Sequence, residues 1–299
     1  VGTADREARR HTMTVRSLAA DHAACADVLR RSRSNFALPI RLLPEEKRRG
    51  TTALYAFCRR ADDIVDDAAV SAVAGRRLVA FERDLEVALA GGQSADPVIR
   101  AVVDSVRRFP VPPEYLREII DGVRMDLVQH SYETFADLEH YCRRVASAVG
   151  LAAIHIWGFR TPEAIPASHA CGMAFQLTNI LRDIPEDLGR GRIYLPREDL
   201  AAHGCTPEDL AAGRLGREFA QLAEVEFSRA VAGFRQACVL DRMLSTDGRL
   251  VFRAMHGVYR ALLGAVRRGG SRIFTERLRP SKPMILSAAV ASLVAGPRS

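Results

Sequence analysis

The chain has 299 residues, of which 48% are hydrophobic and 26% charged, so it can bury a substantial core and has an ordinary globular composition. Its net charge of +7 favours anionic partners: nucleic acid, anionic membrane surfaces or phosphorylated small molecules. The six cysteines lie far apart without a CxxC pair, which argues against a zinc site or a disulfide framework and fits a reducing cytosol.

Helical periodicity dominates the chain. Apolar residues recur at helical spacing, as in Leu78, Phe81 and Leu85, and alternating strand-like runs are scarce. Breakers rich in proline and glycine at 91–97, 109–113, 161–166, 188–196 and 203–207 divide the chain into eight to ten helices. We expect residues 1–12 to be irregular, without the apolar core of a signal peptide. No linker separates two units, so the sequence predicts one all-α domain over residues 1–299.

The first acidic segment, "RRADDIVDDAA" at residues 59–69, places four aspartates within six positions. On a helix Asp62 and Asp66 share one face, whereas Asp63 and Asp67 lie about 100° further round the axis. Like charges at this spacing repel each other, more strongly when they are desolvated. A solvated acidic turn explains the segment as well as a divalent-cation site does, and Asp67 suits the solvated end of such a turn.

A second segment, "QLTNILRDIPEDLGRGRIYLP" at 176–196, places Asn179, Asp183 and Asp187 at successive i,i+4 steps, with Arg182 between them. Pro185 is expected in the last turns of this helix. Two oxygen-bearing helices in a basic all-α chain predict facing walls of one cavity, in which metal ions and arginines hold a diphosphate. Such coordination makes the diphosphate a leaving group, and an apolar cavity would protect the resulting carbocation from water.

Three segments resemble the signature regions of the squalene/phytoene synthase family: "ALYAFCRRADDIVDD", "YCRRVASAVGL" at 141–151, and the segment at 176–196. Weaker likeness at 255–266 and 272–282 extends the match over residues 30–285. The resemblance implies an isoprenoid synthase helical bundle around a central apolar cavity. It also implies a head-to-head condensation of two prenyl diphosphates that depends on Mg²⁺, for which Mn²⁺ can substitute.

The resemblance assigns roles to individual residues. The metal ligands are expected to be Asp62, Asp63, Asp66, Asn179, Asp183 and Asp187. The diphosphate contacts are expected to be Arg59, Arg182, Tyr55, Tyr259 and Arg277. The prenyl-chain pocket is expected to contain Phe36, Val145, Ala146, Gly150 and Gln176. The catalytic set is expected to be Tyr141, which matches a tyrosine near the cation and the proton transfer, with Asp62, Asp66 and Asp183. Core packing remains an alternative role for the tyrosines at 55 and 259 and for the small residues.

The resemblance leaves the product open. "VASAVGL" is more similar to bacterial presqualene diphosphate synthases, whereas "VAGTVG" is typical of phytoene synthases. We therefore expect two farnesyl diphosphates to give presqualene diphosphate in squalene and hopanoid biosynthesis, with phytoene synthesis from two geranylgeranyl diphosphates as the alternative. A non-catalytic assembly factor of the same fold and a nucleic-acid binder are further alternatives, although no nucleic-acid-binding motif is present. NADPH is not expected, since no dinucleotide fingerprint is found.

The apolar stretch at 283–296 is too short to cross a bilayer, which takes about 20 residues. With neighbouring arginines, it suggests peripheral contact with the inner face of a membrane. We therefore expect a cytoplasmic protein that binds prenyl diphosphates and no nucleic acid. Contact with downstream isoprenoid enzymes is a further expectation.

Overall fold

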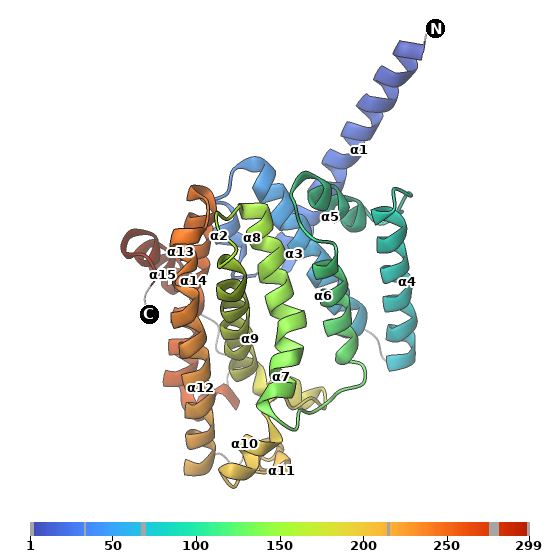
Figure 1. The fold of residues 1–299 in the computed structure, drawn as a ribbon. Helices are drawn as coiled ribbons and strands as arrows, with labels where there is room; N and C mark the ends of the chain where they lie inside the picture. The colour runs from blue at the N-terminus through green and yellow to red at the C-terminus, as the bar shows by residue number, and fades with distance from the viewer. Residues whose placement is uncertain (1–2, 33, 67–69, 214–215, 275–280, 298–299) are drawn as a thin grey trace.

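The computed structural model describes residues 3–32, 34–66, 70–213, 216–274 and 281–297, and these ranges contain helices but no β-strand (Figure 1). Two isolated β-bridges join Ser131 to Ile193 and Phe159 to Leu244. The longer helices are α1 (Thr3–Ser32), α3 (Glu45–Asp66), α4 (Ser71–Leu89), α5 (Pro97–Arg108), α6 (Glu114–Met125), α7 (Phe135–Cys142), α8 (Ala148–Trp157), α9 (Ala164–Gly189), α12 (Arg217–Ala237), α14 (Thr246–Gly269) and α15 (Lys282–Ala295). The shorter elements are α2 (Ala37–Ile40), α10 (Arg197–Ala202), α11 (Pro207–Ala211), α13 (Leu240–Met243), the π-helix η1 (Arg143–Ser147) and the 3₁₀-helix η2 (Gly270–Phe274).

The all-α prediction is confirmed, and the start of the chain differs from the expectation. The backbone of α1 is helical from Thr3, whereas the sequence predicted an irregular segment over residues 1–12. Residues 1–12 contain two alanines and three arginines, both of which favour a helix. Figure 1 shows the first turns of α1 projecting away from the rest of the bundle.

Two large groups of buried side chains form most of the core, and a small third group joins α14 to α15. One group joins α3, α5, α6 and α8, and the other joins α7, α9, α12 and α14. Phe36 and Phe175 pack against both groups. A Cβ atom added to Gly172 on α9 would lie only 2.6 Å from Cα of Ser147, so a glycine here allows α9 to approach η1 closely.

The helix α9 ends as the sequence predicts. Pro185 lies in the last turns of α9, and the helix ends at Gly189. Gly191 follows with φ +73°, a left-handed conformation that glycine adopts without strain. The chain then turns back toward α3.

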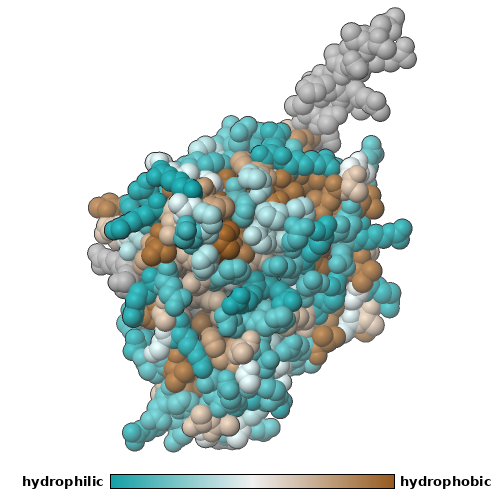
Figure 2. Space-filling model, in the orientation of Figure 1, coloured by the Kyte–Doolittle hydropathy of each residue, from teal (hydrophilic) through white to brown (hydrophobic). Residues whose placement is uncertain are grey.

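The surface is mixed in polarity. The face drawn in Figure 2 is mainly hydrophilic, with hydrophobic side chains in scattered groups. Within the described ranges, none of the helices has the length and apolar character needed to cross a membrane.

Candidate active site

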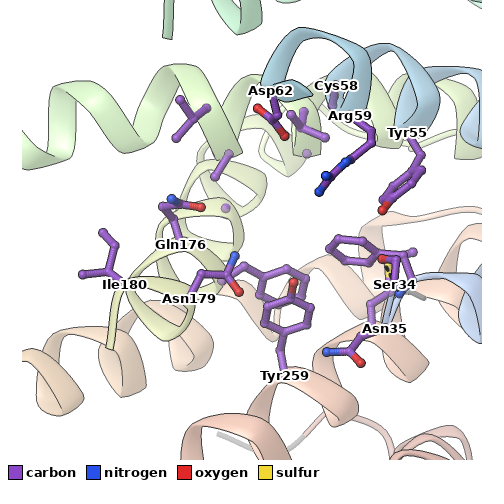
Figure 3. A pocket seen from close by; sticks show the side chains of 18 of the residues that line it. Ser34, Asn35, Tyr55, Cys58, Arg59, Asp62, Gln176, Asn179, Ile180 and Tyr259 are labelled. Atoms are coloured by element: carbon purple, nitrogen blue, oxygen red, sulfur yellow. Dashed lines mark hydrogen bonds between the residues drawn. The ribbon is translucent and has the colours of Figure 1, made fainter. Parts of the chain in front are cut away.

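A large cavity of about 1340 Å³ runs between the α3, α6 and α8 side of the bundle and the α9 and α14 side. Figure 3 shows Tyr55, Arg59 and Asp62 pointing from α3 toward Gln176 and Asn179 of α9. Its volume exceeds the range of about 300–1,000 Å³ that is usual for small-molecule sites. The predicted central cavity is therefore present, and both acidic helices line it.

The first acidic segment contributes two of its aspartates to the cavity wall. Asp62 and Asp66 line the cavity, one helical turn apart on α3. Asp63 does not line it; its carboxylate lies 2.6 Å from the guanidinium of Arg59. Asp63 is about 100° from Asp62 around the axis, and its role as a metal ligand stays a prediction. Asp67 lies outside the described residues.

The carboxyl of Asp62 is held in an unfavourable environment for charge. Solvent reaches the residue inside the open cavity, yet protein atoms surround the carboxyl closely. Burial raises the pKa of Asp62 to about 7, and the negative charges of Asp66 and Asp126 contribute further. A bound cation would reverse this effect, because it stabilises the ionised carboxylate.

The second acidic segment faces the same cavity from α9. Asn179, Asp183 and Asp187 all line it. Arg182 donates two hydrogen bonds to Asp183, one of them 2.7 Å from Nε to Oδ1. Burial and the nearby Asp183 raise the pKa of Asp187 to about 7. The Oδ1 atom of Asn179 is buried and has no hydrogen-bond partner among the described residues, so it is an oxygen available to a ligand.

The loop after α9 connects the two acidic segments. Arg190 and Arg192 each donate a hydrogen bond to the carboxylate of Asp66, at 3.1 and 3.2 Å. The sequence prediction gave neither arginine a role, although both stand in the quoted "LGRGRIYLP" segment. The two motifs are therefore cross-linked by ion pairs.

The oxygen atoms of this site fit divalent ions that are shared with a substrate. No group of three His, Cys, Asp or Glu side chains within the described ranges is close enough to hold an ion alone. Mg²⁺ commonly takes one or two protein carboxylates and completes its shell with water and phosphate oxygens. The carboxylates of two facing helices and the unpartnered Asn179 oxygen suit that arrangement.

Comparison with known proteins identifies the family. The squalene/phytoene synthase family model matches residues 29–284. The chain belongs to the squalene/phytoene synthase family. It is 35% identical over 280 residues to a 15-cis-phytoene synthase of Synechococcus elongatus, covering 90% of this chain and 91% of the relative.

Solved structures of the family share this fold. A dehydrosqualene synthase crystallised with a ligand is 29% identical with a TM-score of 0.85, and the match covers 93% of this chain and 96% of that one. The squalene synthase HpnC from Alicyclobacillus acidocaldarius is 31% identical with a TM-score of 0.72, over 86% of this chain and 93% of that one.

Four of the five predicted diphosphate contacts lie in the described ranges, and all four line this cavity. They are Tyr55, Arg59, Arg182 and Tyr259. Tyr259 is nearly buried, and its ring stacks parallel to Phe175 with 4.0 Å between the centroids. Burial raises the pKa of Tyr259 to about 12, so its hydroxyl stays protonated and can donate a hydrogen bond at neutral pH. Arg277 lies outside the described residues.

All five residues predicted for the prenyl-chain pocket line the cavity: Phe36, Val145, Ala146, Gly150 and Gln176. Two of them, Val145 and Ala146, lie in the π-helical turn η1, an element that often marks functional sites. A Cβ atom on Gly150 would lie 3.2 Å from Oγ of Ser168. Gly150 therefore serves helix packing and lines the cavity at once.

Tyr141 belongs to a buried hydrogen-bond network that the sequence did not predict. Its hydroxyl donates to Oδ2 of Asp126 at 3.1 Å, and the hydroxyl of Tyr194 donates to Oδ1 at 2.9 Å. The rings of the two tyrosines stack with centroids 5.2 Å apart. Burial raises the pKa of Asp126, while Arg192 and the tyrosine hydroxyls oppose the shift. Asp126 is a single aspartate after α6 and belongs to no sequence motif, so the sequence alone could not predict this role.

Proposed function

We propose that this chain joins two geranylgeranyl diphosphates head to head to form phytoene. Family membership makes the chain a prenyltransferase-type enzyme. The observation that carries the proposal is the cavity, in which two facing acidic helices adjoin a long apolar section. The name of the 35% identical relative, 15-cis-phytoene synthase, favours the C20 substrate over the C15 substrate that "VASAVGL" suggested.

The arginines and carboxylates perform the binding. Arg59 and Arg182 lie on opposite walls, and their planar guanidinium groups can donate paired hydrogen bonds to diphosphate oxygens. Asp62, Asp66, Asn179, Asp183 and Asp187 are the residues that would hold the divalent ions on which family members depend. Such ions, when bound, neutralise the charge that develops on the departing diphosphate.

The rest of the cavity controls what happens to the carbocation. The C–O bond of one substrate breaks, and its electron pair leaves with the diphosphate. The double bond of the second substrate then forms the new C–C bond, and loss of a proton closes a cyclopropane ring. Departure of the second diphosphate and loss of a second proton give a hydrocarbon without any reductant. Apolar side chains along the cavity would keep water from these cations.

The hydroxyl of Tyr141 is placed to interact with these intermediates. It lines the cavity and is fixed by its hydrogen bond to Asp126. Burial raises the pKa of Tyr141 well above its usual value, so the hydroxyl remains neutral and presents its oxygen to a migrating proton.

Product analysis tests the proposal. Purified protein would be incubated with farnesyl or geranylgeranyl diphosphate, with and without Mg²⁺ and NADPH. We expect phytoene from the C20 substrate, only when Mg²⁺ is added and with or without NADPH. Conversion of the C15 substrate to presqualene diphosphate without any C20 product would overturn the assignment. That second candidate is favoured by the 31% identity to the squalene synthase HpnC.

We also propose peripheral membrane contact through α15. Leu286, Val290 and Val294 are 54%, 50% and 83% exposed and recur at four-residue intervals, so they form one apolar stripe. Ile285 of the same helix lines the cavity, which places this stripe next to a wall of the substrate site. We expect the protein to float with anionic vesicles at low salt and a variant with serine at all three positions to remain unbound. Absence of flotation by the unaltered protein would refute the contact.

Contact with downstream isoprenoid enzymes stays a prediction.

A further inference from the structure

The only tryptophan of the chain, Trp157, lies at one end of the cavity. Thr51 and Asp62 both line the cavity from α3, and eleven residues of helix separate them by roughly 16 Å. The indole of Trp157 hydrogen-bonds to Thr51. Trp157 therefore lies at the end of the cavity that is remote from the carboxylates.

The other wall leads to the same conclusion. Tyr141 and Trp157 both line the cavity, and the continuous helical segment of α7, η1 and α8 separates them by sixteen residues, roughly 24 Å. The remote end is apolar, with side chains that include Ile40, Ile154 and Phe252. A prenyl chain whose diphosphate lies among the carboxylates has to extend toward this end.

Trp157 is held at its indole, its backbone and its Cβ atom. Its Nε1 donates to Oγ1 of Thr51 at 3.0 Å, and that hydroxyl donates onward to the carbonyl of Lys47 at 2.8 Å. The ammonium of Lys47 donates to the carbonyl of Trp157 at 2.6 Å and forms an ion pair with Asp247 at 2.7 Å. A Cβ atom on Gly248 would lie 2.9 Å from Cβ of Trp157, so α14 leaves no space behind it. Rotation of the indole would break its hydrogen bond to Thr51, whereas Lys47 and Gly248 hold the backbone and Cβ of Trp157 in place.

We propose that Trp157 sets the longest prenyl chain that the cavity accepts, by closing its remote end. The inference rests on the proposed function only in that the ligand is a prenyl diphosphate. Shorter chains end before the indole, the longest accepted chain contacts it, and a chain one isoprene unit longer would have to displace it. Thr51 is then a positioning residue, since it acts through the indole.

Fluorescence of the single tryptophan gives a test that needs no turnover. Non-reactive thiodiphosphate analogues with C10, C15 and C20 chains would be titrated into the whole protein with Mg²⁺, and binding would be followed in parallel by calorimetry. We expect the emission of Trp157 to change on binding of the C20 analogue and to stay constant on binding of the C10 analogue. Equal emission changes for every analogue that binds, or none for any, would overturn the proposal.

Turnover gives a second test with a matched control. We expect Trp157→Ala to raise the ratio of C25 to C20 turnover at least tenfold, and Thr51→Val, which keeps the volume but removes the hydroxyl, to raise it less. Ile156→Ala serves as the control, because Ile156 is equally buried on α8 but does not line the cavity. A ratio for Trp157→Ala within twofold of the unaltered protein would contradict the proposal.

The outcomes separate the two hypotheses. A protein that turns over no prenyl diphosphate of any length refutes the proposed function, whereas an active protein with an unchanged ratio refutes only the role of Trp157. If Trp157→Ala does not fold, the fluorescence of the unaltered protein decides.

Discussion

The guanidinium of Arg192, three residues beyond the end of α9, lies 3.2 Å from the carboxylate of Asp66 near the end of α3. This pair joins the two acidic segments, which are 126 residues apart along the chain at this point. Arg190 and Arg192 reduce the repulsion among the carboxylates. A bound diphosphate would compete with Asp66 for the guanidinium group of Arg192. Substrate binding would therefore break the Arg192–Asp66 ion pair.

Arg192→Met should therefore weaken substrate binding more than it slows the chemistry. We expect KM for the prenyl diphosphate to rise about 10- to 100-fold, since a charge-assisted hydrogen bond to a partly buried group contributes about 1.5–3 kcal/mol. Steady-state kinetics measure the change. Arg197→Met is the control, because Arg197 is half-exposed, pairs with Glu133 and does not line the cavity. An equal effect of both variants would contradict the role of Arg192.

The cavity-facing aspartates should be essential for turnover. Asp62→Asn and Asp183→Asn are each expected to lower kcat by about 10²–10³-fold, because each removes a charge that would bind the metal. The folded state should persist, as circular dichroism would show. Asp63→Asn should keep activity within a few-fold of the unaltered protein, since this residue does not line the cavity. A chain that works as an assembly factor would tolerate all three changes.

Removal of divalent metal should abolish turnover without unfolding the protein. EDTA is expected to stop product formation, and added Mg²⁺ to restore it. Inorganic diphosphate with Mg²⁺ should raise the melting temperature, since a ligand at 100 times its Kd adds about 2.7 kcal/mol to the free energy of unfolding. Diphosphate in EDTA is the control. A melting temperature that rises equally in EDTA would show that the diphosphate binds without metal.

The network around Asp126 should matter for both stability and rate. Asp126→Asn keeps one oxygen that can accept from a tyrosine hydroxyl and replaces the other by an NH₂ group, which cannot accept the second bond. We expect a loss of about 1–3 kcal/mol in the free energy of unfolding. We also expect a lower kcat than in Tyr194→Phe, which leaves the bond from Tyr141 intact. Urea unfolding and single-turnover kinetics measure the two effects. A kcat no lower than that of Tyr194→Phe would contradict this role.

The buried Glu226, which lies outside the candidate site, predicts how the free energy of unfolding changes with pH. This residue is buried and its Oε1 accepts a hydrogen bond from Arg229 at 2.7 Å, yet burial outweighs that pair and raises the pKa of Glu226 from 4.5 to about 7. Its contribution to stability is therefore fully present below pH 4.5 and is lost as the pH rises through about 7, because the folded state binds the proton more tightly.

Glu226→Gln should remove this dependence. We expect the variant to exceed the unaltered protein in free energy of unfolding by about 1–3 kcal/mol at pH 8 and to differ little at pH 4.5. Urea titrations at both pH values measure the difference. The exposed Glu224, which pairs with Arg267, provides the control variant Glu224→Gln. Equal pH profiles for the unaltered protein and Glu226→Gln would refute the assignment.

The parts of the site that follow helical spacing were predictable from the sequence. Asp62 with Asp66, and Asn179 with Asp183, share a face because i and i+4 residues do so on any helix. The resemblance added Asp63, although the same spacing places it about 100° from Asp62 around the helix axis.

The parts that depend on packing between distant segments were not predictable. Asp126 gains its role only when two tyrosines meet it, and Arg192 only when the loop after α9 returns to α3. Trp157 closes a cavity whose length no local pattern encodes.

The π-helical turn η1 determines which side chains of its helical segment face the cavity. Its i→i+5 hydrogen bonds add one residue to the turn that a regular α-helix would not contain. This turn lies between Tyr141 upstream and Gly150 downstream. An α-helix drawn through the same segment would rotate these two residues by about 100° relative to each other. The extra residue thus allows one hydroxyl and one small residue to face the same space. Deletion of a residue here would therefore harm the site more than most substitutions in the same turn.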